Sequence, residues 1–151
     1  MDWRMETPLG PMVFREENGA VTALRFAAEG ECETLPPPAS ELSLRAEDWL
    51  RRYFAGDKPT TELPFNPAGT AFQRRVWQAA CAIPYGETVS YGQLASQIGC
   101  ASARAVGAAL GKNPIWLLIP CHRVIGADGS LTGYAGGLEK KAALLALEKR
   151  T

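Results

Sequence analysis

The sequence predicts a mixed α/β (α+β) fold in two parts, residues 1–67 and residues 68–151. Three observations support this prediction. A hairpin signal, Asn18-Gly19, lies between two apolar segments near the N-terminus. Two capping boxes, which start at Thr70 and Ser90, open helices in the second part. Three prolines that precede the boundary indicate an extended connection between the parts.

The N-terminal part is predicted to contain a hairpin, a loop and one helix. Met12–Arg15 and Val21–Phe26 are the expected strands of the hairpin. The acidic and proline-rich stretch Glu31–Pro38 predicts a loop. A helix is predicted to begin at Ser40 and to end at Gly56, because its apolar residues recur at helical spacing. These apolar residues are Leu42, Ala46, Trp49, Leu50 and Tyr53.

The second part is predicted to be mainly helical. A helix that begins at Thr70 has one apolar face and is broken at Pro84-Tyr85-Gly86. A short helix begins at Ser90, the chain turns at Gly99-Cys100-Ala101, and another helix extends from Ser102 to Gly111. Two short helices joined by a glycine-containing turn are typical of a helix-turn-helix, and the pattern alone favours a plain helical hairpin equally.

The composition is that of an ordinary globular protein, with 46% hydrophobic and 21% charged residues. No apolar run approaches the length of a bilayer crossing, and the N-terminus lacks the apolar core of a signal peptide. The four cysteines show no C-x-x-C spacing and the chain holds one histidine, so we expect no metal site. These features predict reduced thiols, a cytoplasmic location and no membrane partner.

Charge is unevenly divided along the chain, although the formal net charge of the whole is zero. Residues 1–67 contain 7 Lys and Arg against 12 Asp and Glu, which leaves a formal charge of −5. Residues 68–151 contain 9 against 4, which leaves +5. Such asymmetry indicates a polyanion as the partner of the second part; the alternative is a chance division of solvated charge.

Cys121-His122 is the candidate reactive pair, and His122 is the only histidine of the 151 residues. The apolar run Ile115–Ile119 before it predicts a buried strand, and a turn cluster follows at Gly126–Ser130. A thiol and an imidazole at the end of a buried strand favour a reactive thiolate, although most buried cysteines are inert. Adjacent side chains of an extended segment point to opposite sides, so the pair needs a turn or a bridging water.

Several motifs, in order along the chain, resemble those of the O6-alkylguanine–DNA alkyltransferases. The resemblance extends from about Gly69 to Glu148. Its motifs are Arg104-Ala105-Val106-Gly107, Asn113-Pro114, Pro120-Cys121-His122-Arg123-Val124 and Gly133-Tyr134-Ala135-Gly136-Gly137. Weaker matches nearer the N-terminus are Thr7-Pro8-Leu9-Gly10 and Tyr53-Phe54-Ala55-Gly56.

The resemblance implies a small ribonuclease H-like α/β N-terminal domain and a mainly helical C-terminal domain with a helix-turn-helix. It also implies DNA repair by a monomer that flips O6-alkylguanine out of double-stranded DNA and moves the alkyl group onto its own cysteine. Flipping is needed because O6 of guanine is buried in the base pair. The thioether product offers water no carbonyl to attack. The protein would therefore act once, as a methylated-DNA–protein-cysteine methyltransferase, and would need no cofactor.

Five residues are assigned catalytic roles by the resemblance. Cys121 is the expected nucleophile, and His122 is expected to take its proton through water. Asn113 braces the turn that holds the cysteine, although an asparagine there would also simply end a helix. Tyr91 donates a proton to N3 of the base, unless it is an ordinary aromatic of a first helical turn. A buried Glu148 would need a partner, for which His122 is the natural candidate; the alternative is an exposed glutamate in a frayed last turn.

Three further residues are expected to contact the flipped base. The backbone of Val124 reads the exocyclic amine, and Tyr134 covers the base. Ala135 stands where some relatives have serine, so only its backbone N–H can serve O6. The glycines around Tyr134 leave room for the base and its alkyl substituent.

The helix from Ser102 to Gly111 is the predicted DNA-binding element. Arg104, Gly107, Ala108 and Gly111 lie on one face, which is nearly bare except for the arginine. Such a face can approach a sugar-phosphate backbone, or it can pack against another helix. The resemblance places this helix in the minor groove, with Arg104 filling the stack that the nucleotide leaves. The helix offers few side chains that could read base edges, so binding is expected to be independent of sequence.

Other functions fit parts of the pattern. A helix-turn-helix regulator would need base-reading side chains and a dimerisation heptad that this chain lacks. A cysteine hydrolase built on Cys121 and His122 would turn over repeatedly on an ester. An alkyltransferase-like protein that only flags lesions would lack the cysteine that this chain keeps.

Overall fold

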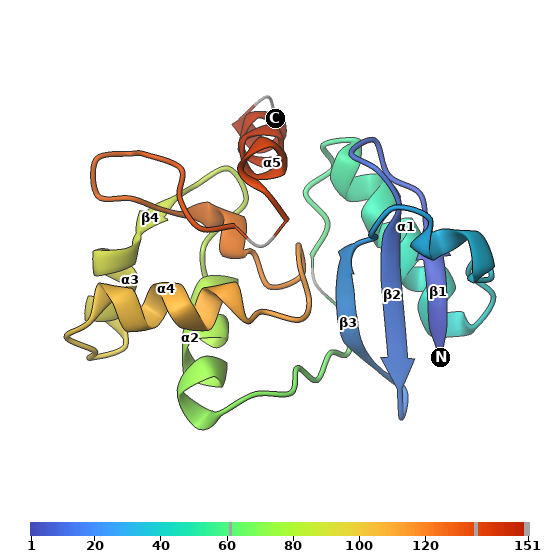
Figure 1. The fold of residues 1–151 in the computed structure, drawn as a ribbon, viewed down its shortest axis with the longest axis horizontal. Coiled ribbons are helices and arrows are strands. Elements are labelled where there is room, and N and C mark those ends of the chain that lie inside the picture. Colours follow the sequence, from blue (N-terminus) through green and yellow to red (C-terminus); the bar gives the residue numbers. More distant parts are fainter. Residues whose placement is uncertain (61, 135, 150–151) are drawn as a thin grey trace.

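The computed structural model describes residues 1–60, 62–134 and 136–149. Its N-terminal part contains an antiparallel sheet with the strand order β1-β2-β3 (Figure 1). The strands are β1 (Asp2–Met5), β2 (Met12–Glu17) and β3 (Ala20–Phe26). Between β2 and β3, Asn18 has φ 52° and Gly19 has φ 77°, the two left-handed conformations that a tight hairpin turn requires. The predicted hairpin is confirmed.

Helix α1 (Glu41–Phe54) lies behind the sheet in Figure 1 and buries the apolar face that its sequence predicts. The side chain of Ser40 accepts a hydrogen bond from the backbone N–H of Ser43, which caps the helix, and Gly56 follows its end at φ 86°. The predicted loop before it contains a short 3-10 helix, η1 (Glu31–Thr34). Glu31 stabilises this turn by pairing with Arg25 and accepting from the N–H of Ala28.

Helices α2 (Ala71–Cys81), α3 (Tyr91–Gln97) and α4 (Ala103–Gly111) form the body of the second part (Figure 1). Both predicted capping boxes are present, at Thr70 and at Ser90. Between α3 and α4 the chain turns at Gly99, which has φ 70°. The short helices and their glycine turn are therefore confirmed, as is the mixed α/β fold class.

The remaining elements lead from α4 to the C-terminus. They are the 3-10 helix η2 (Cys121–Arg123), the strand β5 (Val124–Ile125) and the helix α5 (Leu138–Lys149). Strand β5 pairs in parallel with β4 (Val89–Ser90), just before α3. This pairing places the segment after Cys121 beside the start of α3, where Tyr91 lies.

The predicted strand over Ile115–Ile119 is wrong. The segment is buried as expected, but its backbone turns back on itself: the N–H of Ile119 donates to the carbonyl of Ile115 at 3.0 Å, and Leu117 has φ 71°. The side chain of Asn113 accepts from the N–H of Ile115 and donates to the carbonyl of Ile119. It thereby supplies hydrogen bonds that a neighbouring strand would otherwise supply.

Strand β3 connects the two parts of the chain. The N–H of Val21 donates to the carbonyl of Pro64, so the proline-rich connection lies beside the strand. The N–H of Leu24 donates to the carbonyl of Pro114, and the N–H of Trp116 donates back to the carbonyl of Leu24. Buried apolar side chains from both parts form one continuous core. The division at residue 67 stays an interpretation of the sequence.

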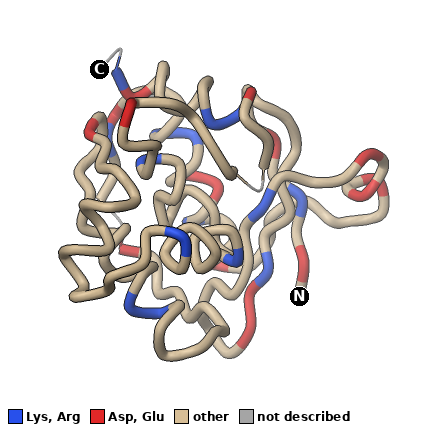
Figure 2. The backbone as a smooth tube through the Cα atoms, turned by 60° about the vertical axis from the view of Figure 1, so that its left-hand side comes forward, with Lys and Arg blue, Asp and Glu red and all other residues tan. Residues whose placement is uncertain are grey.

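Figure 2 shows Asp and Glu in red, and acidic residues of the N-terminal part lie on the loop that projects at its right-hand edge. None of the helices in the described part of the chain combines the length and apolarity that a bilayer crossing requires.

Candidate active site

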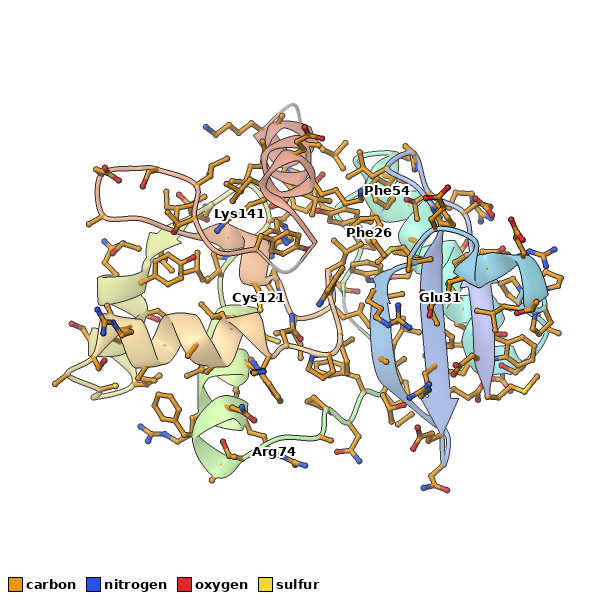
Figure 3. All side chains as sticks on the ribbon, in the orientation of Figure 1. Phe26, Glu31, Phe54, Arg74, Cys121 and Lys141 are labelled. Carbon is orange, nitrogen blue, oxygen red and sulfur yellow. The ribbon has the colours of Figure 1, made fainter. Side chains whose placement is uncertain are left out.

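Cys121 lies at the start of η2 and not at the end of a strand. The N–H of Cys121 donates to the carbonyl of Ile119 at 2.8 Å, which draws the chain into a tight turn. The side chain is buried, with 6% of its surface exposed, between α4 and the segment that leads to α5 (Figure 3). The expectation that Cys121 follows a buried strand is therefore wrong, and of the two arrangements expected for the Cys121-His122 pair, a turn or a bridging water, the structure contains the turn.

Asn113 is hydrogen-bonded both to the turn over Ile115–Ile119 and to the sulfur of Cys121. Its Nδ2 group donates to Sγ of Cys121 at 2.9 Å and to the carbonyl of Ile119 at 3.0 Å. Its Oδ1 accepts from the N–H of Ile115 at 2.9 Å. All three contacts are buried, so the predicted bracing geometry of Asn113 is present. Burial raises the pKa of Cys121 to about 12, and the donated hydrogen bond from Asn113 opposes this rise.

Glu148 is buried on α5 and pairs with His122, as the sequence predicted. Its Oε2 lies 2.6 Å from Nε2 of His122 and accepts the hydroxyl of Tyr53 at 2.5 Å. Its Oε1 accepts Nε of Arg123 at 2.8 Å and the N–H of Gly86 at 3.1 Å. Nη2 of Arg123 also reaches Oε2 at 3.2 Å. Burial opposes ionisation of this carboxyl, but the donors, His122 first, outweigh it and lower the pKa of Glu148 to about 2.

The same contacts decide the tautomer of His122. An ionised carboxylate only accepts hydrogen bonds, so Nε2 must be protonated and Nδ1 must hold the lone pair. Nδ1 is buried and makes no hydrogen bond within the described residues. Burial lowers the pKa of His122 against the opposing effect of Glu148. The charge of Arg123, which balances that of the carboxylate, also lowers the pKa of His122.

Tyr91 and Val124, the residues expected to read the base, meet at Lys141. Nζ of the buried Lys141 donates to the carbonyls of Val124 at 2.7 Å and Thr132 at 2.8 Å. The hydroxyl of Tyr91 donates to the same carbonyl of Thr132 at 2.8 Å. Burial lowers the pKa of Lys141 to about 8. Both groups expected to contact the base are therefore engaged with the protein in this structure.

Tyr134 lies over His122, with their ring centroids 6.5 Å apart and the planes at 81°. Its ring also packs against Trp116 at 5.8 Å, and its hydroxyl is buried without a hydrogen-bond partner in the described ranges. A Cβ at Gly136 would lie 2.8 Å from the Tyr134 ring and 3.2 Å from Trp116, so that position must be glycine. Ala135 lies outside the described residues.

The predicted DNA-binding face of α4 is solvent-facing. Arg104, Ala108 and Gly111 are exposed, and Gly107 is half-buried beside the Tyr91 ring. Ser102 is exposed, and its hydroxyl caps α4 by accepting from the N–H of Ala105. A shallow depression of about 350 Å³ is lined by Tyr91, Ala103, Arg104, Gly107, Thr132 and Gly133. It connects the open face of α4 to the hydroxyl of Tyr91.

Sequence reasoning missed two side chains that contact Glu148. Arg123 stands in the same motif as Cys121, and a cation directly after a buried run is a signal that could have identified it. Tyr53 begins the weaker motif Tyr53-Phe54-Ala55-Gly56, but its helical spacing indicates only a core position on α1, so the sequence assigns it no role. No group of three or more His, Cys, Asp or Glu side chains within the described residues is arranged to hold a metal ion.

Known proteins resemble this chain in sequence and in overall fold. The sequence profile described as 6-O-methylguanine DNA methyltransferase, DNA binding domain, matches residues 71–150. A Mycobacterium tuberculosis protein named methylated-DNA–protein-cysteine methyltransferase is 45% identical over 150 residues, which cover 96% of this chain and 90% of the relative. A Methanosarcina acetivorans protein of the same name is 43% identical over 148 residues, which cover 95% and 94%. The crystal structure of Mycobacterium tuberculosis OGT in complex with DNA has a TM-score of 0.88 at 45% identity, covering 99% of this chain and 92% of that one.

We predict that His122 is neutral and protonated on Nε2 at pH 6. Its lowered pKa means that the unfolded chain takes up a proton below about pH 6.5 while the folded protein does not, so acidification through this range lowers stability. Imidazole ¹⁵N chemical shifts measure the tautomer directly, since the chain has one histidine. A protonated ring at pH 7, or a proton on Nδ1 instead of Nε2, would contradict this assignment.

Proposed function

This chain belongs to the 6-O-methylguanine DNA methyltransferase family, and from that premise we propose that it repairs O6-alkylguanine in duplex DNA by moving the alkyl group onto Sγ of Cys121. The observation that most strongly supports the proposal is the buried set of contacts around the sulfur. Asn113 donates to Sγ, and the next residue, His122, is oriented by Glu148. A nucleophile, a base and a group that orients the base are thereby supplied by one compact site.

The chemical step is an in-line displacement. The sulfur of Cys121 forms a bond to the alkyl carbon while the bond from that carbon to O6 breaks, and the guanine leaves as an anion. The thiol proton passes to Nδ1 of His122 through a water molecule. This transfer leaves the net charge of the buried site unchanged, because the new imidazolium balances the new thiolate. His122 can therefore accept a proton from Cys121 although burial disfavours a proton taken from solvent.

The base is recognised mainly by backbone and aromatic groups. The carbonyl of Val124 accepts the exocyclic amine with its second lone pair, since Lys141 occupies the first. The hydroxyl of Tyr91 donates to the carbonyl of Thr132 in this structure. When the base is bound, it donates to N3 of the base instead and supplies a proton there. Tyr134 covers the ring. The expected contact of Ala135 with O6 lies outside the described residues. Val124 and Tyr91 already lie close together through Lys141 and Thr132. Their predicted hydrogen bonds to the base therefore require only small rearrangements of these groups.

Helix α4 places the protein on the minor groove without reading the sequence. The small residues Gly107, which is half-buried, and Ala108 and Gly111, which are exposed, allow close approach to the sugar-phosphate backbone, and Ser102 lies at the helix start. Arg104 enters the stack at the position that the flipped nucleotide leaves. The depression between Arg104 and Tyr91 gives the extruded nucleotide a path toward the site.

The protein acts once and needs no cofactor, because the DNA itself supplies the alkyl group and the thioether is stable to water. A helix-turn-helix regulator would not consume its own cysteine, and a cysteine hydrolase would turn over repeatedly. We further propose a monomer in the cytoplasm. The cytoplasmic location is supported by the four cysteines, all of which are free thiols.

The direct test is intact-protein and peptide mass spectrometry after mixing with duplex DNA that contains O6-methylguanine. We expect one methyl group per molecule, on Cys121, and no further activity. Cys121→Ser should take up none, whereas Cys32→Ser, a matched change at a cysteine of the N-terminal part, should react like the wild type. Repeated turnover, or a methyl group on another cysteine, would overturn the proposal.

Arg104→Ala separates DNA handling from chemistry. Because unstacking a base costs a few kcal/mol, loss of the side chain that replaces it should slow repair in a duplex by about tenfold or more. Transfer from free O6-benzylguanine should change by less than about twofold, since no stack is opened. Arg74→Ala, which removes another exposed cation, is the control. Equal losses on duplex and free base would mean that Arg104 acts on the fold instead.

A further inference from the structure

We propose that Tyr53, on α1, is a positioning residue for alkyl transfer, whose hydroxyl holds Glu148 in the orientation that fixes His122. The inference rests on the proposed function and deepens it. Tyr53 lies outside the matched residues 71–150, so part of the proton-transfer machinery comes from the N-terminal sheet-and-helix part of the molecule.

The hydroxyl of Tyr53 contacts both members of the acid–base pair. It donates to Oε2 of Glu148 at 2.5 Å and lies 3.5 Å from Nε2 of His122. Only 1% of the tyrosine surface is exposed. Its ring is stacked on Trp49 with centroids 5.3 Å apart and meets Tyr85 edge-on at 5.7 Å. A ring held in this way gives its hydroxyl one position.

The contact lengths indicate what Tyr53 does to the carboxylate. Arg123 bonds Oε1 of Glu148 closely, at 2.8 Å, but its second contact, from Nη2 to Oε2, is 3.2 Å. Oε2 instead lies 2.5 Å from the Tyr53 hydroxyl and 2.6 Å from Nε2 of His122. Without the tyrosine hydroxyl, Oε2 is free to turn toward Nη2 and shorten that charge-assisted bond. The bond to His122 would then lengthen.

A longer bond between Glu148 and His122 would change the reactivity of the Cys121 sulfur, because His122 takes the thiol proton. The short Glu148 bond orients the ring and stabilises its protonated form, which exists only after Cys121 has given up its proton. A longer bond stabilises the imidazolium less, so fewer molecules hold the thiolate–imidazolium pair and the pKa of His122 falls further. The hydroxyl of Tyr53 therefore acts on the reaction without touching the substrate.

The test is Tyr53→Phe, with Tyr85→Phe as the matched control. Each change deletes one phenolic hydroxyl, but that of Tyr85 is buried without a hydrogen-bond partner in the described part of the chain. The substrate is free O6-benzylguanine, so DNA binding does not enter. We expect Tyr53→Phe to slow transfer to Cys121 by about tenfold, the effect of one hydrogen bond to a charged group, and to move the acid-side midpoint of the pH–rate profile to lower pH, because His122 then takes up a solvent proton less readily. Tyr85→Phe should match the wild type in both.

The outcomes distinguish the inference from the function it rests on. If wild-type protein gains no benzyl group on Cys121, the proposed function fails. If wild type reacts and Tyr53→Phe has an unchanged or higher acid-side midpoint, only the positioning role is overturned, even where the rate falls. Affinity for undamaged duplex DNA should be the same for wild type and both variants.

Should Tyr53→Phe not fold, 3-fluorotyrosine placed at position 53 keeps the ring and the hydroxyl but makes the hydroxyl more acidic. If the Tyr53 hydroxyl acts on the Glu148–His122 pair, this change alters the ¹⁵N shifts of His122 and displaces the pH–rate midpoint from that of the wild type. Unchanged values of both would overturn the proposal.

Discussion

One buried carboxylate joins the segments on which the site depends. Glu148 accepts hydrogen bonds from His122 and Arg123 on η2, from Tyr53 on α1 and from the backbone of Gly86. A buried charge is costly unless it is paired, and Arg123 supplies the opposite charge at 2.8 Å. Removing one partner of such a pair costs about 3–5 kcal/mol, so the fold and the chemistry share one requirement. The two carboxylate oxygens of Glu148 therefore hold three segments together. These are η2, which contains Cys121, the helix α5, which contains Glu148, and the N-terminal helix α1.

The charge balance of this site explains how a poor base can still serve the reaction. Glu148 and Arg123 compensate each other, so a proton added to His122 from solvent would leave an uncompensated buried charge. A proton taken from Cys121 leaves no uncompensated charge, because the new thiolate balances the new imidazolium. The site therefore favours proton transfer within itself over protonation from outside. In the proposed reaction Asn113 stabilises the developing thiolate, since its N–H already donates to Sγ.

Local patterns predicted the elements that form locally. The hairpin turn at Asn18-Gly19 and the capping boxes at Thr70 and Ser90 are each completed within a few residues, and all are present. The strand over Ile115–Ile119 failed because an apolar run records burial but not how the backbone is hydrogen-bonded, and here a side chain supplies those bonds. The partner of His122 was found because helical spacing and the family resemblance agreed. Tyr53 was missed because it meets Glu148 across 95 residues, a contact that no local pattern encodes.

The central claim is that the carboxylate of Glu148, by orienting His122 and stabilising its protonated form, sets the reactivity of Cys121. The most direct measurement is the pH–rate profile of Glu148→Gln on free O6-benzylguanine, taken below the melting temperature of the variant. The amide keeps the shape of the side chain and loses its charge. The account predicts transfer roughly tenfold to a hundredfold slower, the value of a hydrogen bond to a charged group, with the acid-side midpoint at lower pH. A rate and midpoint equal to those of the wild type would contradict it, and would make Glu148 a structural residue alone.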